Sequence, residues 1–182
     1  HQVRPIQAAR MESDVLPELY GSYLKLGFGS HTTPLGELSI SSQRKKGGVV
    51  SLSAGHMSSQ GKLKLSNDQK VFAGYSDTRI DFDAKKIFRN TELSGRAGFD
   101  ALTRYFYGHH PDTLAEPDKE DIKQRYLMMG AGMVFKSTHG DSSRLNYSLD
   151  LDYGYTQDTY SNLQHALGFK ATAFRSFIKG IA

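Results

Sequence analysis

The sequence predicts an all-β fold: an antiparallel transmembrane β-barrel with about eight strands in this chain, either complete or part of a larger barrel. Three observations lead to this prediction. Apolar side chains recur with a period of two along most of the 182 residues. Many of the alternating segments reach ten residues or more, whereas strands of ordinary globular proteins average about five or six. Long and short connections alternate between them, which is typical of barrels in outer membranes.

Eight segments carry the alternation, and the clearest covers residues 145–155, where leucine and tyrosine alternate with aspartate and other small polar residues. Ten residues at about 3.4 Å each match a tilted bilayer crossing. Residues 1–15 lack the pattern and are interpreted as a periplasmic lead-in or linker, and residues 16–182 as the transmembrane strands. The eight predicted segments are 23–29, 37–41, 50–55, 78–85, 92–101, 127–136, 145–155 and 163–173.

The two sides of these segments differ in kind, because one side carries charges of both signs together with glycine. In a membrane barrel this side lines the interior and the apolar side meets lipid, whereas in a soluble sandwich the apolar side is the core. The predicted lumen-facing charged residues are Arg79, Asp81, Asp83, Lys85, Arg96, Asp100, Asp150, Asp152 and Lys170. The predicted lipid-facing residues are Leu24, Leu26, Phe28, Ile80, Phe82, Phe99, Leu149, Leu151 and Phe169.

The connections favour the barrel and suggest an orientation. The long stretches GKLKLSNDQ and GHHPDTLAEPDKEDIK alternate with the tight FRNTE and THGDS. With the N-terminus in the periplasm, the long stretches fall outside the cell and the tight ones inside. Amphipathic rings are then expected near the outer boundary, although aromatic residues also favour strands in general. The predicted interface aromatics are Tyr105, Phe106, Tyr107, Tyr153 and Tyr155.

The amino-acid composition excludes several other classes of protein. Ten Phe and ten Tyr argue against a disordered chain, and no run approaches the roughly 20 apolar residues that a membrane helix needs. The absence of Cys excludes a disulfide scaffold, a zinc–thiolate site and a thiol nucleophile. The net charge of +4 is mild and no aromatic-basic motif accompanies it, so nucleic acid is not expected as a partner.

The sequence offers only weak candidates for a catalytic or metal-binding site. His109 and His110 with Asp112 could bind a metal or act as acid and base, but adjacent histidines in a polar loop are more often solvated. The basic triplet 44–46 is read as a solvated turn rather than a contact for anionic headgroups. No G-x-S-x-G elbow occurs, so we expect no enzyme, no catalytic residue, no metal and no cofactor. The lumen charges either line a water-filled passage or pair with one another and fill a narrow interior.

Several segments also carry a family resemblance: LPELYGSYLKLGFG, the TTPLGEL restart, the basic turn with the Gly- and Ser-rich strand after it, HMSSQGK, and the later FRNTELSGRAGFD. From about Arg4 to Phe174 the chain resembles Bacteroidota-type outer-membrane barrel proteins, often described as TonB-dependent-receptor-like. The resemblance implies the outer membrane of a Gram-negative bacterium and a barrel of more than eight strands. The ending FIKGIA lacks the terminal aromatic of the family's last strand, which indicates a piece of a larger barrel.

These observations predict a non-enzymatic outer-membrane barrel with a structural or accessory role in the envelope, or a passive, porin-like passage. One alternative is the barrel portion of a TonB-dependent-receptor-like transporter, although no plug domain is recognisable here. The other is a soluble β-sandwich binding module. The expected partners are outer-membrane lipid and, in a complex, other envelope proteins or lipoproteins.

Overall fold

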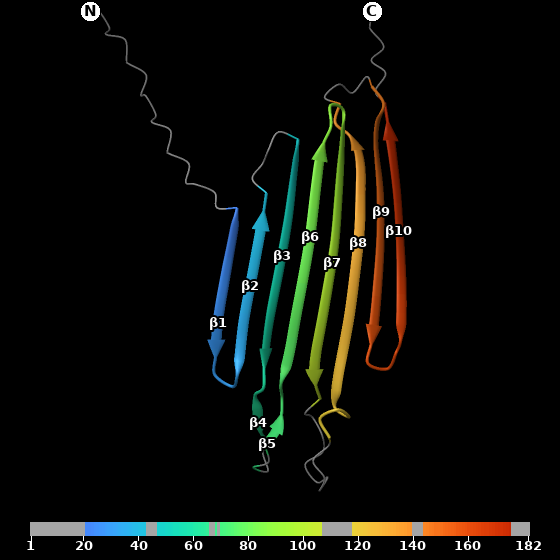
Figure 1. Cartoon of the computed structure of the whole chain (residues 1–182). Coiled ribbons are helices and arrows are strands. Elements are labelled where there is room, and N and C mark those ends of the chain that lie inside the picture. The colour runs from blue at the N-terminus through green and yellow to red at the C-terminus, as the bar shows by residue number, and fades with distance from the viewer. Residues whose placement is uncertain are drawn as a thin grey trace, which may run out of the picture.

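In a computed structural model, the described residues are 21–42, 47–65, 68, 70–106, 118–139 and 144–175, and they form two antiparallel sheets and no helix (Figure 1). The all-β antiparallel prediction is therefore confirmed. The large sheet contains β1 (Ser22–Gly29), β2 (Thr33–Ser41), β3 (Gly48–Ser59), β6 (Tyr75–Ile87), β7 (Thr91–Tyr105), β8 (Lys123–Ser137), β9 (Asn146–Asp158) and β10 (Leu163–Phe174). The small sheet contains β4 (Lys62–Lys64) and β5 (Lys70–Phe72). Within the described ranges, no helix is long and apolar enough to cross a membrane.

Each of the eight predicted segments corresponds to one strand of the large sheet. Most observed strands are longer than the prediction, and β7 and β8 reach 15 residues each. The β4–β5 hairpin was not predicted, because the stretch GKLKLSNDQ was read as a polar loop. Three-residue strands such as Lys62–Lys64 are too short for alternation to separate them from irregular chain.

The large sheet is a meander, in which each strand pairs with the strand that precedes and the strand that follows it in the sheet. Its register keeps the alternation in phase from strand to strand. A line of ladder partners runs across five strands through Ser53, Asp81, Gly98, Gly130 and Gly154. We call the face that contains this line the polar face. The opposite face, which carries Ile80 and its partner Phe99, is the apolar face.

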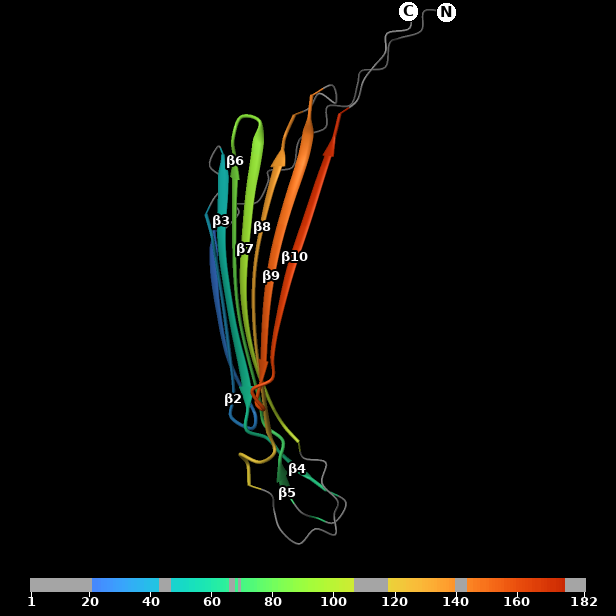
Figure 2. The same ribbon diagram turned by 90° about the vertical axis from the view of Figure 1, so that its right-hand side faces the viewer.

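The sheet is open. β1 and β10 are its two edges, and the closed barrel that the sequence predicted is not formed in this structure. Viewed from the side, the sheet is a single curved layer, and its extensive contacts all join strands that are neighbours in a ladder (Figure 2). As a result the described residues contain almost no core, and Val71 in β5 is their one buried hydrophobic side chain, with 7% of its surface exposed.

The connections agree only in part with the predicted alternation. The β4–β5 hairpin and the end of β7 lie at one end of the sheet, so both long stretches share that end (Figure 1). The tight turn at residues 88–90 lies at the other end, as predicted. However, the tight turns at residues 30–32 and 159–162 lie at the end of the long stretches. The end of the long stretches therefore also carries tight turns, which the sequence analysis did not consider. Most of THGDS lies outside the described residues.

Candidate functional site: the polar face of the sheet

The register gathers the predicted charged residues on one surface. β6 contributes four of them, β7 and β9 two each, and β10 one, and all of them share the alternation phase of the polar face. They are Arg79, Asp81, Asp83 and Lys85, then Arg96 and Asp100, then Asp150 and Asp152, and finally Lys170. The nine residues predicted to face lipid all lie on the apolar face.

Two arginines of the polar face bind carboxylates of a neighbouring strand. Arg79 on β6 donates from Nε to Oδ1 of Asp100, its direct partner on β7, at 2.7 Å. Arg104 on β7 donates from Nη1 and Nη2 to both carboxylate oxygens of Asp77 on β6. A two-pronged contact of this kind fixes the relative position of two strands more tightly than a single bond does. Sequence reasoning missed Arg104 and Asp77, although their alternation phase could have identified them.

A third arginine spans two ladders instead of one. Arg96 on β7 donates to Oδ1 of Asp152 on β9 at 2.5 Å, although β8 lies between the two strands. Gly132 of β8 is the ladder partner of both residues. A Cβ atom at Gly132 would lie 2.6 Å from Oδ1 of Asp152 and 2.8 Å from Nε of Arg96. The arginine can therefore cross the β8 backbone only because residue 132 has no side chain.

Near the opposite end of the strands, one carboxylate serves two lysines. Glu92 on β7 accepts from Lys85 of β6 at 2.9 Å and from Lys136 of β8 at 3.2 Å. Glu92 is only 8% exposed, whereas both lysine side chains are nearly half exposed. Three adjacent strands are thus held together at one carboxylate. The sequence analysis identified Lys85 but not Glu92 or Lys136.

Small side chains are the second feature of the polar face. One ladder row contains Gly98, Gly130 and Gly154 and ends at Ala166 of β10. Serines occupy matching positions on β2 and β3. The glycines of this face are Gly27, Gly29, Gly55, Gly98, Gly130, Gly132, Gly154 and Gly168, against Gly36, Gly48 and Gly95 on the apolar face. Glycine in a strand permits bending and close approach, so the sheet can curl toward its polar face.

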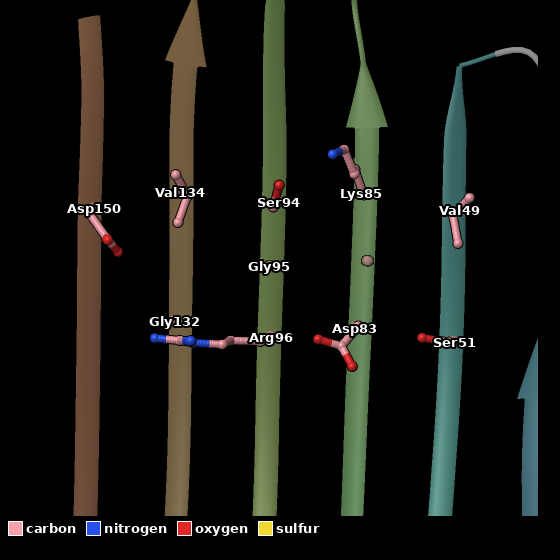
Figure 3. A pocket seen from close by; sticks show the side chains of 11 residues that line it. Val49, Ser51, Asp83, Lys85, Ser94, Gly95, Arg96, Gly132, Val134 and Asp150 are labelled. Carbon is pink, nitrogen blue, oxygen red and sulfur yellow. The ribbon is translucent and has the colours of Figure 1, made fainter.

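Between the charged side chains lies a shallow hollow of about 350 Å³ (Figure 3). Charges of both signs line it, namely Asp83, Lys85, Arg96 and Asp150. Oδ1 of Asp150 is enclosed and has no hydrogen-bond partner among the described residues. The described part of the chain holds no group of three or more His, Asp and Glu residues that could bind a metal.

The predicted interface aromatics are spread over two levels. Tyr105 ends β7 and Phe106 follows it, at the end of the long stretches. Tyr105 packs edge to face on Phe72 of β5, with ring centroids 4.7 Å apart, and so ties the small hairpin to the large sheet. Tyr155 and Tyr153 lie on the apolar face of β9, closer to the middle of the strand. They therefore lie at a different level along the strands from Tyr105.

Several sequence candidates lie outside the described residues. These are Tyr107, His109, His110, Asp112 and the triplet 44–46.

Comparisons with known proteins add no relative. No protein-family model, no curated protein and no solved structure matches the chain significantly.

Proposed function

We propose that this sheet is the wall of an outer-membrane β-barrel, with its apolar face in lipid and its polar face toward the interior, and that its role in the cell envelope is structural or accessory rather than enzymatic. The observation that carries the proposal is the apolar face itself. It extends across all eight strands, with His56, Thr78 and His165 as polar side chains within it, and the only described segment that touches it from outside the sheet is the β4–β5 hairpin, at Tyr105.

The exposure of this face is far greater than an aqueous surface tolerates. Leu167 is 83% exposed, Phe28 77% and Leu26 75%. Burial of one such side chain stabilises a protein by about 1.5–3 kcal/mol. Soluble monomers rarely present a contiguous apolar patch of more than a few hundred Å². A face eight strands wide therefore requires an apolar environment, which is either lipid or another protein layer.

The height of the apolar band fits a bilayer. On β8 the band runs from Leu127 to Phe135, about 27 Å along the strand at about 3.4 Å per residue. With a tilt of about 40° this corresponds to roughly 20 Å in depth, close to the apolar band of about 25 Å on barrels of outer membranes. Arg125 and Ser137 occupy the next positions of the same face, so polar groups bound the band at both ends.

The polar face favours lipid over a second protein layer as the cover. A sandwich would leave this face in bulk water, where its many glycines would weaken the strands without any gain. Inside a barrel the same glycines make room, because the interior is narrower than the exterior and must accommodate every inward side chain. Glycine is more frequent on the polar face than on the apolar face, as curvature toward the polar face requires, and larger apolar residues such as Leu35, Met57 and Leu102 share that face with it.

The ion pairs favour a filled or neutral interior over a charge-selective pore. The three arginines described above each hold a carboxylate, and Glu92 holds two lysines. Opposite charges that pair across strands stabilise the barrel wall. They do not form a ring of charges of one sign, which is the arrangement that ion-selective pores use. A passive passage remains the second form of the proposal and predicts weak ion selectivity.

Reconstitution tests the proposal. The chain is refolded by dilution into lipid vesicles and, in parallel, into buffer without amphiphile. We expect protease-resistant strands, vesicle flotation and an electrophoretic mobility that changes on boiling only in the presence of lipid. A chain that stays folded and monomeric in plain buffer would instead establish the soluble sandwich. Planar-bilayer recordings then separate the two forms, since a structural barrel gives no steady conductance and a passage gives one with weak selectivity.

A further inference from the structure

We propose that β1 and β10 of the same chain pair directly with each other and close an eight-stranded barrel. The inference rests on the proposed function, because an unpaired sheet edge is excluded only where no water can reach it. It goes further by naming the partner of each edge.

Both edges are built for pairing. Neither β1 nor β10 contains proline, and each carries a single charged residue, Lys25 on β1 and Lys170 on β10, so the features that protect free edges in soluble proteins are sparse on both. Every residue of both strands is exposed. In hydrocarbon, each unsatisfied backbone group of an edge is strongly unfavourable, so each edge needs a strand beside it.

Strand direction permits the closure. Eight strands in a meander are joined by antiparallel ladders only, so the first and the last run in opposite directions. Figure 1 shows β1 and β10 with opposed arrows. The two edges can therefore form one more antiparallel ladder of the kind that already joins all the others, with no change of topology.

The alternation restricts the register of this ladder. Lys25 and Gly27 lie on the polar face of β1, and Lys170 and Thr172 lie on that of β10. Leu26 must therefore face an odd-numbered residue of β10, because a shift by one would send its side chain to the wrong face. The ladder row that begins at Leu26 ends at Leu163. A closing shear of about eight residues pairs Leu26 with Ala171, and a shear of about ten pairs it with Ala173.

The interior fits this small number of strands. An eight-stranded barrel has space inside for little more than side chains. From β7 to β10 the row of Gly98, Gly130, Gly154 and Ala166 carries almost no side-chain volume, and this leaves space for the long arginines of the adjacent rows, although the same row holds Asp81 on β6 and Tyr23 on β1. A wide barrel with a water-filled lumen has no need for such a row. The polar face therefore favours closure by the chain's own edges over insertion of further strands between them.

Cysteine cross-linking tests the pairing, since the natural chain has no Cys. Leu26→Cys is combined in turn with Phe169→Cys, Ala171→Cys and Ala173→Cys, and the folded protein is oxidised in vesicles. Leu26→Cys with Thr172→Cys is the control for the wrong face. Tyr153→Cys with Leu167→Cys, which are direct partners in the β9–β10 ladder, is the positive control.

We expect an intramolecular disulfide for one of the first three pairs, with Ala171→Cys or Ala173→Cys giving the highest yield, and little product for the Thr172→Cys pair. Disulfides between two chains would contradict the proposal and indicate assembly from copies. No cross-link at any of these positions, with a positive control that reacts, would also overturn it and mean that another strand lies between the edges. Vesicle flotation of the same samples reports on the proposed function separately, so the two ideas can fail independently.

Discussion

A charge placed on one face or the other of β8 should distinguish the two faces sharply. Met128 and Met129 are adjacent and identical in type, but Met128 lies on the polar face beside Asp100 and Met129 lies on the apolar face beside Phe99. The perturbation is Met129→Arg, and the matched control is Met128→Arg. In the control the new guanidinium lies on the polar face beside Asp100, which already binds Arg79, and it meets no hydrocarbon, so its free-energy change is expected to be much smaller than that of Met129→Arg.

The magnitude follows from the depth of the site. Met129 lies two residues from the middle of the band Leu127–Phe135, about 7 Å along the strand and about 5 Å in depth after tilt. Arginine on a lipid-facing site costs about 2–4 kcal/mol at the midplane and about 0–1 near the interface. We therefore expect Met129→Arg to lower the free energy of unfolding by about 2–3 kcal/mol, which reduces the ratio of folded to unfolded protein roughly 30- to 150-fold.

The assay is equilibrium unfolding in urea, monitored by circular dichroism, in vesicles of two acyl-chain lengths. In the longer-chain lipid the loss should be larger, because the site then lies deeper relative to the interface. Equal losses for the two variants would refute the assignment of the faces. A loss at Met129→Arg that is independent of acyl-chain length would refute lipid as the cover and point to a protein core.

Two further predictions concern the polar face. Gly132→Val should lower the urea midpoint in vesicles, because the new Cβ occupies the path of Arg96 to Asp152. The control Gly55→Val should leave the midpoint nearly unchanged, because nothing lies within 4 Å of a Cβ at that position. Similar midpoints for both variants would contradict the contact of Arg96 with Asp152 across β8. Glu92→Gln should lower the free energy of unfolding by about 1 kcal/mol, since it leaves two lysines facing each other. Glu92→Gln combined with Lys136→Met should recover part of this loss in the same urea titration. If the double variant recovers nothing, the two lysines are not coupled through Glu92.

The sequence allowed the strands and the face of each residue to be predicted, because alternation over ten or more residues assigns every side chain to one side. It located Arg79, Arg96 and Asp152 correctly on one surface for this reason. It could not identify the partners, since Arg96 reaches past its neighbour Gly132 to a strand two places away. The role of that glycine appears only in the register, which no single strand reveals.

Local sequence patterns also cannot predict whether the sheet closes into a barrel or what covers its apolar face. Alternation is the same whether Leu149 meets lipid or a second sheet, and the open edges of β1 and β10 carry no local signal of their partner. Short strands, such as those of the β4–β5 hairpin, are also not predicted by alternation. The contact of Phe72 with Tyr105 joins this hairpin to the large sheet, and these two residues are far apart in the chain.

Fluorescence quenching by brominated lipid tests most directly what touches the apolar face, and the absence of natural Trp makes it clean. Phe82→Trp reports from the apolar face of β6 and Met128→Trp from the polar face of β8. We predict that acyl-chain bromines quench the first strongly and the second weakly, while an aqueous quencher such as iodide does not reach the first. A Phe82→Trp signal that neither bromolipid nor iodide changes would mean that the side chain lies in a dry protein interior, and the membrane account would then be wrong.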